Sequence, residues 1–415
     1  MRDQRSESVP SMNFIVRLGV NRANLPVFFT LLGAFLWYYL ALNVMTAISV
    51  SLKTDYLLLM LSHSIGVILA GAIGLVLSRK RYTLLLVWTI LGAVTSLLPL
   101  FDPSFTILNV QLVCFAWGLS FGLGMPACLS LFAEVVPIEK RGRFGGLSLM
   151  FAFLCAVLIN GFAQPLGILF TYLSFGTLRL LGLIPLLKLR LWKEASVTEK
   201  RVASYGILTS FDRRFYLYIA PWFLFNVIDT LEGLLLRNVV RSAFAEYFLL
   251  MELVSLFSLS VFVLIWGVLC DLIGRKPVII LGLSIVGIAY AIISITQANL
   301  LAWFFFFVSD GIAGGMFLTV FVAVIWGDLA PKGSEPFYYY AGNVPLFLAT
   351  IIQFFFVGSI TSLAPTSAFS LAAFFLFLAV LPILFAPETL PEKKLKEREL
   401  KGYIEKAKKT KEKYT

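Results

Sequence analysis

Twelve long apolar segments take up most of this sequence. A helix that crosses the hydrocarbon core of a bilayer needs about 20 apolar residues, and segments of that length lie at 25–50, 55–77, 83–101, 106–133, 146–171, 173–192, 215–237, 246–269, 277–296, 300–327, 337–363 and 366–386. Lipid offers no partner to backbone polar groups, so only helices and closed barrels cross it. Continuous apolar runs do not fit the alternating pattern of a barrel strand. The sequence therefore predicts an all-α membrane protein with twelve transmembrane helices.

The positive charges gather on alternate loops. The two tails and one set of loops hold 30 of the 34 Lys and Arg residues, and the other four are Lys53, Arg179, Arg237 and Arg241. An excess of positive charge marks the cytoplasmic side of a membrane protein. We therefore expect a multi-pass protein of the cell (plasma) membrane with both termini cytoplasmic. The net charge of +11 then follows from topology and contact with the lipid bilayer, and no nucleic-acid partner is expected.

The sequence also repeats itself. Residues 267–276, GVLCDLIGRK, have a weaker copy 196 positions earlier at 71–80, GAIGLVLSRK. A second match pairs Glu134 and Pro137 with Asp328 and Pro331, at an offset of 194. Two matches at nearly one offset indicate two homologous six-helix bundles, the usual architecture of a secondary transporter. We expect an N-terminal cytoplasmic tail at 1–24, an N-terminal bundle at 25–192, a cytoplasmic linker at 193–214, a C-terminal bundle at 215–386 and a basic cytoplasmic tail at 387–415.

The second copy of the repeat resembles the cytoplasmic loop motif of the major facilitator superfamily, which reads Gly, three residues, Asp and then Gly-Arg-Lys. The spacing in helix four resembles that of sugar porters and related metabolite–proton symporters at Gly118, Gly122, Pro126, Glu134, Pro137, Arg141 and Gly142. The Pro-Glu-Thr at 387–389 resembles the sequence that closes sugar porters. Leu75 departs from the pattern, because the first loop motif normally has Asp there, and Cys114 stands where many proton-linked members have Arg. The resemblance implies the major facilitator fold, with helices one, four, seven and ten around a central cavity.

Acidic side chains within the apolar segments are the candidates for ion coupling, because charged groups at lipid depth are costly and usually mark a pathway. Asp229 lies near the middle of helix seven, with Glu232 three residues further on. Asp310 lies near the middle of helix ten, and Glu252 lies in helix eight. A poorly hydrated carboxyl group holds a proton more readily than one in water. We expect protons as the coupling ion, with sodium as an alternative, and structural ion pairs with arginine as the competing explanation.

Amide and aromatic side chains are the candidates for cargo contact, and they suit a neutral hydroxylated cargo. The residues are Trp37, Tyr38, Asn43, Gln111, Trp117, Asn160, Gln164, Asn226, Tyr340, Asn343 and Gln353. No cation is expected at mid-helix in the N-terminal cavity lining, which argues mildly against a dedicated phosphate or dicarboxylate site. The single histidine, His63, is assigned a hydrogen-bonded packing role.

The family resemblance also implies a gate on the cytoplasmic side. Asp271 would meet the positive start of helix five in the other bundle, and the set of gate residues is Asp271, Gly274, Arg275, Lys276, Glu134, Arg141 and Arg143. The alternative is that Arg275 and Lys276 only retain this loop in the cytoplasm.

These observations predict a secondary active transporter rather than an enzyme. The expected activity is movement of a small organic solute, a sugar or a carboxylic metabolite, by alternating access with proton symport. The alternatives are proton-coupled efflux of amphipathic compounds and a non-transporting membrane sensor or scaffold. We expect a monomer with no cofactor and no metal site.

Overall fold

The computed structural model describes residues 19–100, 106–196, 211–391, 400 and 410. Helices make up nearly all of this part. The first half contains α2 (Leu25–Leu52), α3 (Tyr56–Leu77), α4 (Arg81–Ser96), α5 (Ile107–Val135), α6 (Arg141–Arg179) and α7 (Leu183–Ser196). The second half contains α8 (Arg213–Ile273), α9 (Arg275–Ile295), α10 (Leu300–Met316), α11 (Ile325–Leu329), α12 (Glu335–Thr361), α13 (Pro365–Leu378) and α14 (Val380–Phe385). Short turns η1 (Ser78–Lys80), η2 (Leu98–Leu100), η3 (Ile138–Lys140) and η4 (Leu180–Gly182) and the π-helical η5 (Phe317–Val324) link them.

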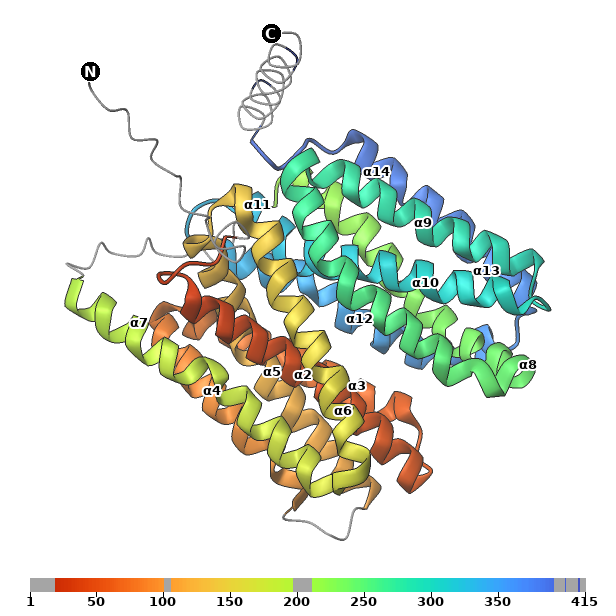
Figure 1. The fold of residues 1–415 in the computed structure, drawn as a ribbon, viewed down its shortest axis with the longest axis horizontal. Coiled ribbons are helices and arrows are strands. Elements are labelled where there is room, and N and C mark those ends of the chain that lie inside the picture. The colour runs from red at the N-terminus through yellow and green to blue at the C-terminus, as the bar shows by residue number, and fades with distance from the viewer. Residues whose placement is uncertain (1–18, 101–105, 197–210, 392–399, 401–409, 411–415) are drawn as a thin grey trace, which may run out of the picture.

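The helices form two groups. Helices α2 to α7 lie together on one side and α8 to α14 on the other (Figure 1). Within the first group α3 packs along α5, and within the second α10 packs along α8. The two groups meet mainly where α6 contacts α8 and where α12 contacts α3 and α5. This is the two-bundle, all-helical architecture that the sequence predicts.

The described residues contain 11 helices that are long and apolar enough to cross a membrane. One of them, α8, has 61 residues and is broken at Phe244, where φ is −141° and ψ is 45°. A helix of that length would extend about 90 Å at 1.5 Å per residue, far beyond one bilayer. Helix α8 therefore supplies two spans on either side of Phe244, which gives the twelve crossings that the sequence predicts.

The boundary between the fifth and sixth spans differs from the expected one. The chain turns back within α6 toward α7 (Figure 1), and its candidate spans are Ile138–Ile159 and Leu169–Leu189. The boundary predicted at 171–173 thus lies inside the sixth span. Gly, Pro and Asn between residues 160 and 167 are turn signals, but such residues are also tolerated inside membrane helices, so they did not fix the boundary.

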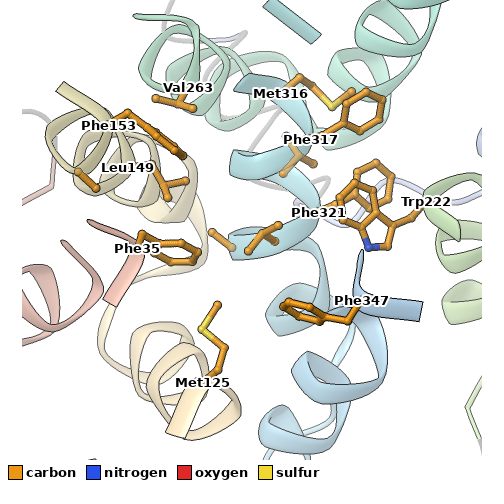
Figure 2. Close-up of a cluster of buried hydrophobic side chains, with 14 of the residues drawn as sticks. Phe35, Met125, Leu149, Phe153, Trp222, Val263, Met316, Phe317, Phe321 and Phe347 are labelled. Carbon is orange, nitrogen blue, oxygen red and sulfur yellow. The ribbon is translucent and has the colours of Figure 1, made fainter. Parts of the chain in front are cut away.

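An apolar layer fills the space between the two groups. Figure 2 shows Phe35, Met125 and Phe153 of the first half on one side of η5, whereas Phe317 and Phe321 of η5 lie on its other side, against Trp222 of α8. Trp222 stacks on Phe321 with ring centroids 4.9 Å apart and planes within 5°. Phe35, Met125, Phe153, Phe317 and Phe321 are buried, and their apolar atoms offer no hydrogen bond to water.

Candidate transport site and gate

Two carboxyl groups lie within electrostatic reach of one another inside spans of the second half. Asp229 lies in α8 and Asp310 in α10, and both side chains are partly exposed. They lie close enough for the charge of Asp310 to act on Asp229. Asp310 accepts a hydrogen bond from the hydroxyl of Ser255 at 3.1 Å. Helix α10 can approach α8 this closely because Gly311 has no side chain, which leaves room for the backbone of Ser255 and the side chain of Ser258.

Other groups surround this acid pair. The phenol of Tyr290 in α9 interacts with Asp229, Asp310 and Glu232. Glu232 is only 7% exposed, and its Oε2 is buried without a hydrogen-bond partner in the described part of the chain. A buried carboxylate oxygen without a partner is costly if charged, so the arrangement favours a bound proton or an approaching donor.

Among the described residues, no arginine forms an ion pair with Asp229 or Asp310. Arg237 acts on both aspartates through its charge, but its ion pair is with Glu252, at 3.6 Å from Nε to Oε1. Both side chains of that pair are well exposed, at 51% and 38%, and such pairs contribute only about 0–1 kcal/mol. Glu252 is therefore the carboxylate that forms the close ion pair with Arg237.

The first half presents aromatic and polar groups around Tyr38 of α2. Tyr38 stacks on Phe121 at 4.5 Å between ring centroids and meets the edge of Phe347 at 6.2 Å across the interface. His63 lies 5.9 Å from the Tyr38 ring. Its Nδ1 lies 3.3 Å from the Cys114 carbonyl oxygen, while its Nε2 is buried without a partner among the described residues. Asn43 also has a buried, unpartnered amide nitrogen.

Two predicted cargo contacts instead anchor the inside of the first bundle. The indole of Trp37 donates to Ser96 Oγ at 2.7 Å, and that of Trp117 donates to the Thr95 carbonyl at 2.8 Å. Both tryptophans are fully buried. They tie α2 and α5 to α4, which explains why aromatic type alone does not identify a cargo contact.

Arg179 is a buried cation at the last residue of α6, where the chain continues through η4 into α7. The structure places it in the middle of the span Leu169–Leu189, only 2% exposed. Its guanidinium carbon lies 3.8 Å from the ring centroid of Trp88 and 5.2 Å from that of Trp37. Its Nε and Nη2 have no hydrogen-bond partner among the described residues. Aromatic faces therefore take the place of a carboxylate beside this cation.

The remaining predicted cargo residues lie in different settings. Asn226 donates to the Trp222 carbonyl at 2.7 Å in its own helix, and Asn343 donates to the Tyr339 carbonyl at 2.9 Å. Gln353 donates to the Thr230 carbonyl and so links α12 to α8. Gln111 is partly exposed in α5. The side chains of Asn160 and Gln164 lie outside the described residues.

The basic end of the molecule is closed by a clasp between the two halves. Asp271, at the end of α8, accepts hydrogen bonds from the backbone N–H of Gly142 at 2.9 Å and of Arg143 at 3.0 Å. It also pairs with Arg143 Nε at 3.0 Å. These donors form the first turn of α6, whose positive end favours an anion. The contact predicted between Asp271 and the start of helix five is thus present.

Arg275 extends the clasp through Asp328. Its side chain is fully buried and pairs with Asp271 at 3.3 Å and with Asp328 at 3.0 Å. The other oxygen of Asp328 accepts from Arg141 of the first half at 2.8 Å. Arg275 also donates to the Ile138 carbonyl at 2.5 Å. Each buried charge in this network has opposite charges beside it, which buried ions require.

The segment after the last helix joins the same network. Glu388 accepts from the backbone N–H of Arg275 at 2.9 Å and of Lys276 at 3.0 Å, and so caps α9. Gly274 leaves room for this carboxylate and has a φ of +103°, which suits glycine. Sequence reasoning noted Glu388 and Asp328 in motifs but did not place them at the gate, because only the fold brings them to Arg275.

The other predicted gate residues lie at the margin. Glu134 pairs with Arg81 at 2.6 Å, with side chains 46% and 24% exposed. Lys276 donates through Nζ to the Leu384 carbonyl at 2.7 Å. Glu134 therefore bonds within the first half, and Lys276 within the second.

Comparison with known proteins agrees with this geometry. A family model described as the Major Facilitator Superfamily matches residues 202–412, just over half of the chain. The chain is a member of the major facilitator superfamily. Its fold is that of a multi-pass membrane transporter. No curated sequence matches the chain.

Solved structures share the fold at low sequence identity. The proton:xylose symporter XylE bound to 6-bromo-6-deoxy-D-glucose gives a TM-score of 0.64 at 16% identity, over 88% of this chain and 96% of that one. A double-tryptophan mutant of XylE gives 0.70 at 15% identity, over 88% and 96%. The human organic anion transporter MFSD10 (TETRAN) gives 0.61 at 13% identity, over 87% and 99%. At these identities the likeness shows the fold alone.

Proposed function

We propose that the chain is a proton-coupled secondary transporter that moves a small organic solute, a sugar or a carboxylic metabolite, by alternating access. The observation that carries this proposal is the pair Asp229 and Asp310, two partly exposed carboxyl groups within electrostatic reach of one another inside membrane spans. Two adjacent carboxylates do not both stay charged at low cost. The pair can therefore take up a proton on one side of the membrane and release it on the other.

The placement of the groups supports this reading. The acid pair lies toward the end of the molecule opposite the clasp, because Asp310 is ten residues from Leu300 while Asp328 ends the same span. The η5 segment, with Phe317 and Phe321, lies between Asp310 and Asp328 along the same span. We infer that this conformation admits cargo and protons from the end opposite the basic loops. On the predicted topology that end is extracellular.

Reconstituted protein tests the proposal directly. We expect a lumenal pH dye in proteoliposomes to report proton entry when one compound from a panel of pentoses, hexoses, and mono- and dicarboxylates is added outside. Replacement of Asp229 by Asn should remove the proton signal, while Glu252→Gln should retain it because Glu252 pairs with Arg237. Cargo uptake with no proton movement in wild-type protein would contradict proton symport.

A second candidate is proton-coupled efflux of amphipathic cations. It is favoured by the unpartnered carboxyl oxygen of Glu232 and by the aromatic group formed by Tyr38, Phe121 and Phe347, since aromatic faces and carboxylates both attract cations. The same vesicles discriminate the two candidates. Addition of hydrophobic amines would then drive protons in the direction opposite to the amine, whereas sugars and carboxylates would give no signal.

A further inference from the structure

The clasp at Asp271 has no chemical equivalent on the other side of the gate. The internal repeat relates Asp271 to Leu75, at the end of α3, and relates Gly142 and Arg143 to Pro336 and Phe337, at the start of α12. Leucine accepts no hydrogen bond, proline has no N–H to donate, and phenylalanine carries no charge. The carboxylate acceptor, the Gly142 N–H and the Arg143 guanidinium therefore have no counterpart at the related contact between α3 and α12, and the N–H of Phe337 donates to the Ser334 carbonyl at 3.0 Å.

At the start of α12, Glu335 and Phe337 make their contacts within the second half. Glu335, the residue before Pro336, accepts a hydrogen bond from the backbone N–H of Gly333 at 2.8 Å. Phe337 stacks on Phe211, with ring centroids 4.9 Å apart and planes within 8°. Neither residue makes a hydrogen bond or ion pair to α3 among those described, so another group must hold α12 against α3.

Tyr340 makes that contact one turn further along α12. Its hydroxyl donates across the interface to the Ile68 carbonyl of α3 at 3.1 Å. Its ring lies over Gly71, where an added Cβ would be only 2.7 Å from Tyr340 Cε2. A glycine is therefore required at 71 for the tyrosine ring to seat in this position.

The repeat shows why a tyrosine stands at this place. Gly71 corresponds to Gly267 and Tyr340 to Gly146. On the clasp side an added Cβ at Gly267 would lie 3.3 Å from the Cα of Gly146, so there the backbones of α6 and α8 are in direct contact. On the other side the aromatic ring occupies the space between the two backbones and supplies the hydrogen bond.

We propose that Tyr340, seated over Gly71 and bonded to Ile68, is a neutral latch that holds α3 and α12 together when the basic end is closed. The gate is then asymmetric, ionic between α6 and α8 and aromatic between α3 and α12. This goes beyond the proposed function, because it depends on neither the cargo nor the coupling ion.

Spin-label distances in detergent without cargo test the latch. Labels at exposed Lys80 and Lys332, in a background with the native cysteines replaced by alanine, report the separation of the segments next to α3 and α12. Tyr340→Phe keeps the ring but removes the hydroxyl, and Gly71→Ala unseats the ring. We expect each to raise the long-distance population about three- to tenfold, the range for loss of one hydrogen bond. The double variant should raise the long-distance population by less than the product of the two single effects, because both substitutions act on one contact.

Gly358→Ala is the matched control on α12, because an added Cβ there meets nothing within 4 Å. Tyr340→Phe is close to isosteric, so a monodisperse variant is expected for measurement even if Gly71→Ala folds poorly. A distance distribution for Tyr340→Phe that matches wild type and Gly358→Ala would overturn the latch. Reduced cargo affinity in Tyr340→Phe with unchanged distances would instead make Tyr340 a cargo contact and would also overturn it.

Discussion

At the scale of single residues, the side chains that carry charge into the spans divide into two kinds. Asp229 and Asp310 lie beside one another with partial exposure, whereas Arg179 is sealed between Trp88 and Trp37. The first kind can exchange protons with water, and the second cannot reach it. We therefore propose a transport role for the two acids and a packing role for Arg179.

Replacement of Asp229 by Asn should abolish gradient-driven accumulation yet permit exchange of cargo across vesicles with no pH difference. An amide keeps the shape of the side chain but cannot take up a proton in the working pH range. Asp310→Asn should do the same or weaken cargo binding, because Asp310 also accepts from Ser255. Uptake against a gradient is the measurement. If Asp229→Asn still concentrates cargo with wild-type pH dependence, Asp229 is structural.

Arg179 and Trp88 should be energetically coupled. Replacing Arg179 by Met should leave the free energy of unfolding nearly unchanged, since it removes two buried nitrogens that lack partners among the described residues and keeps most of the buried volume. Trp88→Leu should lower the free energy of unfolding by about 1–2 kcal/mol more in the wild-type background than in the Arg179→Met background. Only in the wild-type background does the substitution remove a cation–π contact. Unfolding curves of the four proteins in detergent give this coupling. A value near zero would show that the stack contributes packing alone.

At the scale of helices, a small error in one boundary changed the meaning of one charge. The expected sixth helix at 173–192 puts Arg179 in its first half, whereas the candidate span Leu169–Leu189 puts it at the centre. The position of Asp271, predicted from the loop motif, did not depend on such a boundary. The repeat placed Asp271 opposite the start of helix five, and hydrogen bonds to Gly142 and Arg143 lie there. Short motifs that end helices are readable in sequence, but long-range partners such as Asp328 and Glu388 require the packed bundle.

The clasp should show its own opening through a native thiol. Cys270 is fully buried beside Asp271, so its alkylation is slow while α6 and α8 are in contact. In a Cys155→Ser background, Asp271→Asn should speed maleimide labelling of Cys270 roughly tenfold or more, because loss of one partner from a buried charge network costs about 3–5 kcal/mol. Leu75→Ala should leave the rate unchanged, since Leu75 carries no charge. Equal rates in the two variants would contradict an electrostatic clasp.

At the scale of the whole molecule, two features were readable without coordinates: the number of crossings and their division into two bundles. Both follow from the length of apolar segments and from the repeat. The occupants of the interface were not readable, because an apolar residue facing the other bundle and one facing lipid look alike in sequence. Phe321 is buried in the layer between the bundles while Phe355 is 74% exposed, although both lie in aromatic, apolar stretches.

Orientation in the membrane is the whole-molecule prediction that charge supports. Single cysteines at Gly161, Ala298 and Thr366, all exposed at the end away from the clasp, should react with an impermeant maleimide in intact cells. Cysteines at Lys80 and Lys332 should react only after permeabilisation. The reverse pattern would invert the topology and make this conformation one that opens to the cytoplasm.

The apolar layer of Figure 2 has an electrical consequence. On the access proposed above, water reaches the acid pair from the end opposite the clasp, so most of the membrane voltage falls across the layer rather than across the hydrated side. Moving one charge across the whole membrane potential takes about 2.3 kcal/mol per 100 mV. A proton that binds Asp229 in this conformation crosses only a small part of that potential. The larger part of this electrical work is then done when the two bundles move relative to one another and the apolar layer opens. Charge displacement should accompany that rearrangement and not the binding of the proton.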